Sequence, residues 1–323
     1  MSSPRHIVSD FIKRGYVQPA QINDALNCTQ VSPTINSWFK FIDRLLLCLG
    51  ALSLAFSALF FIAYNWDDWG RFGKFALIES MIVATIFLYW VSKKDDLKAQ
   101  ISLLVGSLMV GVLMAFFGQT YQTGADPWTL FFFWAVLITP WVVIARFAPL
   151  WLGWLGLFNV ALSLYIDTFG PLLSLFSSTQ SNVWIVTFLL NSLALIALEL
   201  SSSRFPYLSP RWLARSIASL AGFVITFIVI DTIIDSHNTR LLPFLFWGVF
   251  IAALYVVYRH FRHDLFMLAG GCLSSIVVII TVCIDNLNED YIEGFFLLTS
   301  ALIIGLTSLA TIWLKKVHRE MLS

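Results

Sequence analysis

The chain has 323 residues, of which 59% are hydrophobic and only 12% are charged. Soluble globular proteins carry about 25% charged residues, so this composition excludes that class and indicates a protein embedded in a membrane. The formal net charge of +1 identifies no partner, because the informative quantity is how the charges divide between the two membrane faces.

Residues 1–28 have the pattern of two short helices. Ser3 and Pro4 suit the cap and first turn of one helix, Gly15 ends it, and Pro19 begins the next. A hairpin this small buries too little surface to be stable alone, so we expect it to dock on the membrane domain or on a partner. Nucleic acid is not the expected partner, because the basic residues are too few to bind phosphates. These residues are Arg5, Lys13 and Arg14.

Apolar runs long enough to cross a hydrocarbon layer of ~30 Å recur from Leu45 to Leu314. They predict an all-α fold, in which residues 41–323 form a polytopic transmembrane helical bundle of about ten spans. Residues 1–40 are expected to form the small cytoplasmic hairpin and a linker. The predicted spans are Leu45–Tyr64, Phe75–Val91, Ile101–Phe117, Leu130–Ala145, Leu150–Ile166, Val183–Leu200, Ile217–Ile234, Leu241–Tyr258, Leu265–Ile284 and Ile292–Leu314.

The distribution of basic residues agrees with this span count, because the loops between the predicted spans are alternately rich and poor in Lys and Arg. If the N-terminus is cytoplasmic, all of the 20 Lys and Arg residues lie on the inner face except Arg71, Lys74 and Arg240. This division follows the positive-inside rule and predicts that both termini are cytoplasmic. Acidic residues gather at the outer face, where they would attract cations or simply reflect the exclusion of Lys and Arg from outer loops.

Two polar stretches, Phe60–Lys74 and Gly118–Trp128, are predicted on the outer face. Amides and carboxylates beside aromatic rings suit a polar ligand with apolar faces, or the backbone of a partner. Alternatively, these groups cap helix ends, with Asp126 and Pro127 as the cap and first turn of the fourth span. The candidate binding residues are Tyr64, Asn65, Trp66, Asp67, Asp68, Gln119, Tyr121, Gln122 and Asp126.

Glu79 is the one acidic residue placed well inside a predicted span. A carboxylate in hydrocarbon is costly and usually faces the bundle interior or water, which makes Glu79 a further binding candidate. The alternative is a shallow carboxylate that reaches the outer interface, because five residues of helix span only ~7 Å.

Small residues recur at helical spacing in the third span. Ser107, Gly111 and Ala115 repeat every four residues, which predicts a stripe that another helix approaches closely. Gly270, Gly271, Ser274 and Ser275 predict the same in the ninth span.

No catalytic or cofactor-binding motif is present in the sequence. Zinc-protease, nucleophile-elbow, Walker A and EF-hand patterns are all missing, so we expect a protein that is not an enzyme and carries no cofactor or metal. His260, His263 and Asp264 have a spacing that can serve a metal, but they stand in a basic juxtamembrane loop and are interpreted as part of it.

Two short motifs carry a family resemblance. Ile62-Ala63-Tyr64-Asn65-Trp66, and Gly118-Gln119 with Tyr121-Gln122 and Asp126-Pro127, resemble the bacterial membrane-protein family catalogued as domain of unknown function 2157. The resemblance runs from the hairpin to about the fifth span. It implies a bacterial inner-membrane protein, found alongside a second membrane protein with a Gly-Asp-Tyr signature.

Together, these features favour a non-enzymatic envelope subunit that binds or assembles with a membrane partner through the outer loops and the hairpin. The alternative is a secondary transporter of a small polar or cationic solute, suggested by the ten spans, the acidic mouth and Glu79. An intramembrane transferase or peptidase is a third hypothesis, for which Asp67, Asp68 and Glu79 are the available acids.

Overall fold

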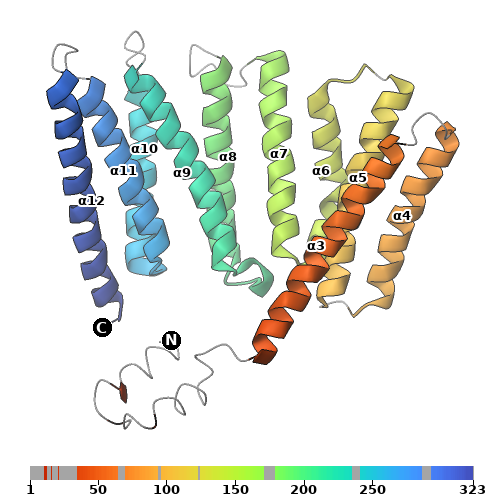
Figure 1. The fold of residues 1–323 in the computed structure, drawn as a ribbon. Coiled ribbons are helices and arrows are strands. Elements are labelled where there is room, and N and C mark those ends of the chain that lie inside the picture. Colours follow the sequence, from red (N-terminus) through yellow and green to blue (C-terminus); the bar gives the residue numbers. More distant parts are fainter. Residues whose placement is uncertain are drawn as a thin grey trace. The chain divides into compact units, whose positions relative to one another are not determined.

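The structure is a computed structural model in which every regular element of the described residues is helical (Figure 1). It forms two compact units, residues 1–74 and residues 75–321. The predicted N-terminal hairpin lies almost entirely outside the described residues. The structure describes residues 11, 12, 16, 21, 35–64, 70–93, 96–122, 124–170, 179–234, 241–285 and 292–322.

Each predicted span corresponds to one helix. Nine of the described helical segments are long and apolar enough to cross a membrane, and α3, which contains the first predicted span, is a further apolar helix. The count of ten crossings stays a prediction. The helices are α3 (Ile35–Tyr64), α4 (Arg71–Val91), α5 (Leu97–Tyr121), α6 (Pro127–Ala145), α7 (Ala148–Phe169), α8 (Thr179–Ser201), α9 (Arg211–Ile234), α10 (Leu241–Val256), α11 (Leu265–Asp285) and α12 (Ile292–Leu322).

The helices extend beyond the predicted spans into the polar stretches. Gly118–Tyr121 form the last turn of α5 and not a loop, and Gln122 ends this helix in a left-handed conformation with φ 43°. Asp126 is the residue before α6 and Pro127 begins the helix, as predicted. The Asp126 side chain makes no capping hydrogen bond. Instead, its carbonyl oxygen accepts hydrogen bonds from the backbone and hydroxyl of Thr129.

The small-residue stripe of α5 receives an aromatic side chain of α6. The indole nitrogen of Trp134 donates a 2.7 Å hydrogen bond to the carbonyl oxygen of Ser107. A Cβ atom added at Gly111 would lie 2.4 Å from the Trp134 ring, so only glycine allows this approach. Gly106 similarly admits Thr85 of α4. The predicted close approach in α5 is therefore confirmed, with an indole ring as the group that approaches.

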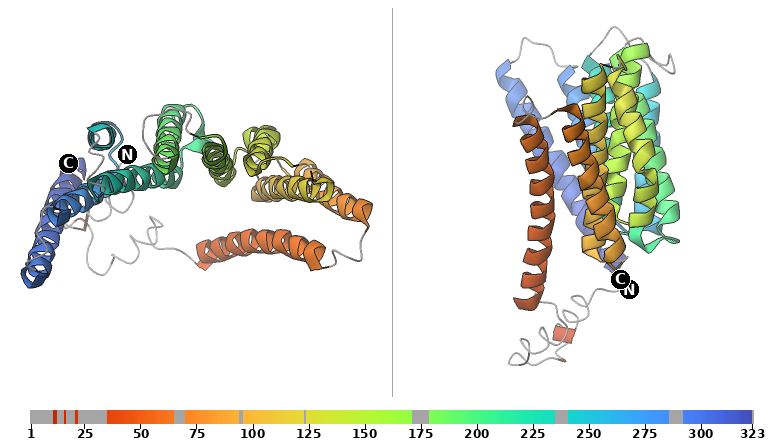
Figure 2. Two further views of the ribbon diagram at one scale, coloured as in Figure 1. Left: turned by 90° about the horizontal axis from the view of Figure 1, so that it is seen from above. Right: turned by 90° about the vertical axis from the view of Figure 1, so that its right-hand side faces the viewer.

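Helices that follow one another from α5 to α9 are neighbours in space (Figure 2), and α9 packs against α8, α10 and α11. The largest buried cluster of residues 75–321 lies around α9, where Ala221 and Ile225 are fully buried. Helix α12 contributes little to this core. Only 6% of its apolar stretch is buried, against 44% in α5, so most of α12 is available to lipid or to another protein.

Candidate functional site

The first group of predicted site residues lies where α3 ends. Tyr64 is the last residue of α3, and its side chain is 91% exposed. The neighbouring candidates, Asn65, Trp66, Asp67 and Asp68, lie outside the described residues. The role predicted for this stretch therefore stays a prediction.

The second group lies at the end of α5, beside the beginning of α4. Gln119, Tyr121 and Gln122 are exposed there. The Tyr121 ring lies 6.0 Å from the ring of Phe75 in α4 and 4.7 Å from that of Phe117. These aromatic contacts hold the two helix ends together.

Asp126, the remaining candidate of the second stretch, is partly buried at the start of α6. The positions of Gln122 and Asp126 are those of helix-flanking residues. They agree with the alternative that part of this motif terminates helices.

Glu79 lies deeper in its helix than its distance from the predicted span end implied. Helix α4 begins at Arg71, so Glu79 is eight residues from its start, about 12 Å at 1.5 Å per residue. Its side chain is exposed, whereas its neighbour Ile78 is fully buried. An acidic side chain at the centre of a membrane-spanning helix raises the free energy of membrane insertion by roughly 2.5–3.5 kcal/mol. A polar partner would therefore stabilise the Glu79 carboxylate.

A cluster of charged residues that the sequence did not indicate joins α8 to the end of α10. The carboxylate of Glu199 accepts a 2.9 Å hydrogen bond from the hydroxyl of Tyr258 and forms a 3.1 Å ion pair with Arg262. Arg262 also donates to the carbonyl oxygen of Glu199 and to the hydroxyl of Ser202. These contacts connect residues about 60 positions apart in the chain.

The same cluster includes α9 and the start of α11. Arg215 donates two hydrogen bonds, of 3.1 and 3.2 Å, to the two carboxylate oxygens of Asp264, whose side chain is only 3% exposed. Arg211 lies 3.7 Å from the Glu199 carboxylate and donates to the carbonyl oxygen of Arg262. The cluster therefore has three guanidinium groups against two carboxylates, an excess of one positive charge.

Irregular backbone between α10 and α11 places these groups. Val257–Phe261 form one π-helical turn, and His263 has a φ of 49°. Such π-turns often occur at functional sites. Asp264, which the sequence grouped with His260 and His263, is instead paired with Arg215. No sequence motif indicates this pairing, because the partners come from separate helices.

The apolar interior also contains one amide pair. Asn191 of α8 is fully buried and donates a 2.6 Å hydrogen bond to the side-chain oxygen of Asn159 in α7 and another, of 2.8 Å, to the carbonyl oxygen of Thr187. Asn159 donates to the carbonyl oxygen of Leu155. The two amides satisfy each other and the backbone, as expected for polar residues that join membrane helices.

The fold defines a multi-pass helical membrane protein. Residues 9–151 match the family described as "Predicted membrane protein (DUF2157)". This match confirms the resemblance drawn from the two motifs, and it ends in the first turn of α7, near the expected limit. No curated protein and no solved structure matches the chain.

Proposed function

We propose that this protein is a non-enzymatic subunit of the bacterial inner membrane that assembles with a second membrane protein, both of its termini being cytoplasmic. The observation that carries the proposal is the exposed carboxylate of Glu79 near the middle of α4. A helix that displays a carboxylate toward hydrocarbon is stabilised when another helix covers it.

The surface around Glu79 is suited to a helical partner. Val83 and Trp90 are 64% and 80% exposed, and they follow Glu79 at intervals of four and seven residues, which places all three on one helix face. The opposite face of α4 is occupied, because Ile78 and Thr85 are buried. The exposed stripe is thus a second contact face of α4, with an acidic group at its centre.

The chemistry of the partner follows from this stripe. Glu79 would be matched by a Lys, Arg or amide side chain within a spanning helix, and the large apolar residues by small or aromatic side chains. The outer candidates Gln119, Tyr121 and Gln122 lie at the same end of α4 and α5 as Phe75, one turn from Glu79. They would supply the polar rim of the same interface.

The test is photocrosslinking in the native host, with a photoreactive amino acid at Val83 and the full-length chain. We expect an adduct with a spanning segment of a second membrane protein that carries a basic or amide residue. Glu79→Gln should lower the adduct yield about tenfold, because interhelical polar contacts are worth 1–2 kcal/mol in model membrane helices.

The matched control is Asp231→Asn, which removes another exposed carboxylate from a spanning helix, α9. It should leave the adduct yield unchanged. An equal yield with Glu79→Gln and the unmodified chain, or adducts with lipid alone at Val83, would contradict the proposal.

The transport alternative has less support from the same residues. The amides of Asn159 and Asn191 satisfy each other and the backbone, and the large cavity among the described helices is lined mainly by apolar side chains. A polar solute needs polar groups with unused hydrogen-bonding capacity along its route. Uptake into proteoliposomes that was lost with Glu79→Gln would restore this alternative.

A further inference from the structure

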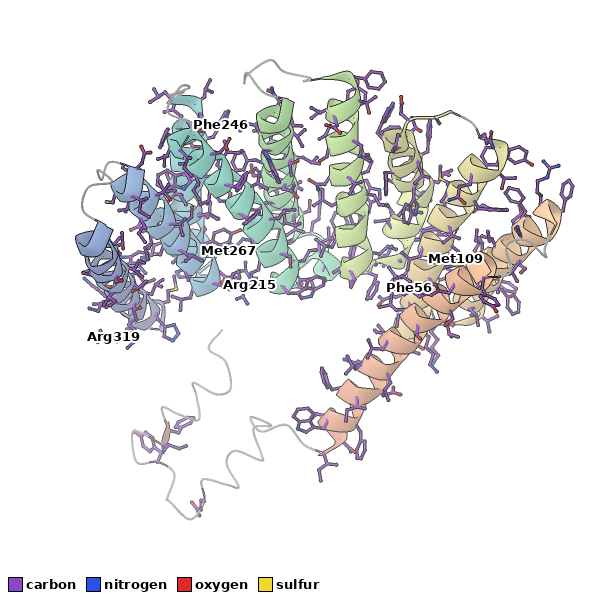
Figure 3. All side chains as sticks on the ribbon, turned by 45° about the horizontal axis from the view of Figure 1, so that its top comes forward. Phe56, Met109, Arg215, Phe246, Met267 and Arg319 are labelled. Atoms are coloured by element: carbon purple, nitrogen blue, oxygen red, sulfur yellow. The ribbon has the colours of Figure 1, made fainter. Side chains whose placement is uncertain are left out.

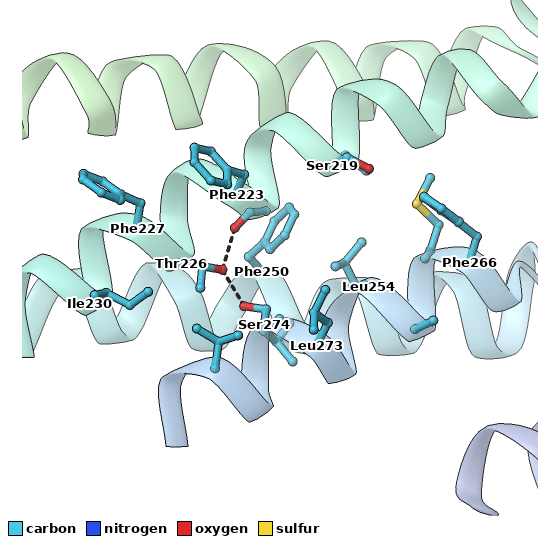
Figure 4. Close-up of a pocket in the computed structure, with 17 residues that line it drawn as sticks. Ser219, Phe223, Thr226, Phe227, Ile230, Phe250, Leu254, Phe266, Leu273 and Ser274 are labelled. Atoms are coloured by element: carbon cyan, nitrogen blue, oxygen red, sulfur yellow. Dashed lines mark hydrogen bonds between the residues drawn. The ribbon is translucent and has the colours of Figure 1, made fainter. Parts of the chain in front are cut away.

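A cavity of about 550 Å³ lies between α9, α10 and α11 (Figure 4). It falls within the 300–1,000 Å³ range of small-molecule sites. Its residues lie outside the family match and were not among the predicted site residues. We propose that this groove, called here the α9–α11 groove, binds one acyl chain of an anionic phospholipid whose headgroup lies beside Arg215.

The walls of the groove are suited to hydrocarbon, because its central polar groups are already satisfied. The hydroxyl of Thr226 donates to the carbonyl oxygen of Gly222 at 2.6 Å, so the 2.6 Å contact between Thr226 and Ser274 uses the hydrogen of Ser274. The indole nitrogen of Trp247 donates to Ser274 at 2.9 Å. Every hydrogen of this group is used inside the protein, which leaves none to bind a polar ligand.

The groove opens on an exposed face of the helices. Phe223 and Leu273 stand on its two sides and are 64% and 61% exposed. Gly270, three residues before Leu273 in α11, also lines the groove, and a Cβ atom added there would meet nothing within 4 Å. Because α9, α11 and α10 with the π-helical turn that follows it are long and apolar enough to span a membrane, the medium outside this opening is lipid.

The length of the groove fits one leaflet. Its lining in α9 runs from Ala218 to Ile230. Ser219 and Phe266 lie toward one end of the groove and Ile230 toward the other (Figure 4). The twelve residue steps from Ala218 to Ile230 correspond to about 18 Å of helix. Half of a hydrocarbon layer of ~30 Å is about 15 Å, so an acyl chain that enters at one membrane face would fill the groove to the middle of the bilayer.

A guanidinium group borders the end near Ser219. The guanidinium of Arg215 lies 5.3 Å from the centre of the Phe266 ring, which lines the groove, and 41% of the Arg215 side chain is exposed. Figure 3 shows Arg215 and Met267 at this same end of α9 and α11. Arg215 and Ser219 are one helical turn apart, on one face of α9. The Nη1 atom of Arg215 has no hydrogen-bond partner among the described residues and is available to a phosphate.

The net charge of the cluster beside the groove favours an anionic lipid headgroup. Arg211, Arg215 and Arg262 outnumber Glu199 and Asp264 by one, so the cluster beside the groove favours an anion over a zwitterion. Each basic residue near a membrane surface is worth about 1 kcal/mol toward anionic lipid, which corresponds to about fivefold in occupancy.

The test places a photoreactive amino acid at Leu273 in the full-length protein, reconstituted in nanodiscs with equal parts of phosphatidylglycerol and phosphatidylethanolamine. Leu193 of α8, which is 65% exposed and outside the groove, is the control position. We expect the adducts at Leu273 to be enriched about fivefold in phosphatidylglycerol relative to those at Leu193. The same lipid composition at both positions would overturn the proposal, as would a protein adduct at Leu273 from a second copy or another chain.

A second variant tests the groove itself. Gly270→Leu places a side chain in the open space of the groove, and Gly153→Leu makes the same change at an open position of α7. We expect Gly270→Leu to reduce the phosphatidylglycerol enrichment at Leu273 to the control value, and Gly153→Leu to leave it unchanged. Enrichment that persisted with Gly270→Leu would show that the lipid lies elsewhere and would refute the assignment.

Discussion

The hydroxyl of Tyr258 donates a 2.9 Å hydrogen bond to the carboxylate of Glu199, and so links the π-helical turn after α10 to the end of α8. Tyr258 is almost completely buried, with 2% of its surface exposed. Glu199 also pairs with Arg262 and Arg211. One carboxylate therefore connects the end of α8 to the start of α9 and to the segment after α10, about 60 residues further along the chain.

Replacement of Tyr258 by phenylalanine should destabilise the protein. The ring would still fill its site, but the partly buried Glu199 carboxylate would lose one donor, at a cost of about 1–3 kcal/mol. The thermal unfolding midpoint in mild detergent should fall by several degrees. Tyr255→Phe, which changes an exposed tyrosine of α10, serves as control and should leave the midpoint unchanged. A midpoint that stayed constant in Tyr258→Phe would show that the hydrogen bond adds nothing to stability.

The Arg215–Asp264 pair should show energetic coupling. Asp264→Asn removes the negative charge that two guanidinium hydrogen bonds and the backbone nitrogen of Phe266 contact. Because Arg215 is 41% exposed, its charge remains partly solvated, so we expect a loss of about 1–3 kcal/mol and not the larger cost of a fully buried pair. In a double-mutant cycle, Arg215→Met with Asp264→Asn should cost less than the sum of the single changes. Strict additivity would mean that the two residues act independently.

Gly111 should not tolerate alanine. The added Cβ atom would lie 2.4 Å from the Trp134 ring, which is held by its hydrogen bond to Ser107 and cannot withdraw freely. We expect Gly111→Ala to cost about 1–3 kcal/mol, the usual effect of overpacking. Gly118→Ala in the same helix meets nothing within 4 Å and should be neutral or slightly stabilising. Equal unfolding midpoints for the two variants would argue against the close contact with Trp134.

The amide pair between α7 and α8 should contribute a modest amount of stability. Asn191→Leu removes the hydrogen bond to Asn159, and interhelical bonds of this kind average about 0.6 kcal/mol in membranes. Leaving the Asn159 side-chain oxygen without this donor adds to the effect. Ser192→Ala is the control, because the Ser192 hydroxyl is buried without a hydrogen-bond partner in the described part of the chain. A larger loss for Ser192→Ala than for Asn191→Leu would contradict this assignment.

Most helices could be predicted from hydrophobicity alone. The predicted eighth span, Leu241–Tyr258, begins with α10 and ends inside the π-helical turn, and the predicted fourth span lies inside α6. Helix ends were less accurate, because polar residues such as Gln119 continue a helix that hydropathy ends at Phe117. Backbone hydrogen bonding continues through these residues whatever the polarity of the side chains.

The candidate site was only partly accessible from the sequence. Glu79 was identified as an acidic residue inside a span, but its exposed position on α4 depends on which face packs against α5. Glu199 could not be identified from the sequence as a site residue, because it lies at the end of an apolar run, where charged residues are common. Its partners Arg262 and Tyr258 are about 60 residues away, and no spacing rule links residues that separate helices bring together.

The sequence by itself determined that this protein crosses a membrane as apolar helices, because hydrocarbon requires every backbone group of a span to be hydrogen-bonded within that span. The sequence also places most basic residues in the loops predicted on one membrane face and many acidic residues in the loops predicted on the other. Only the tertiary structure decided which polar residues meet. The Arg215–Asp264 pair, the Thr226–Ser274 contact and the groove beside them arise from packing between helices. Such packing depends on the shapes of facing side chains and not on their order in the sequence.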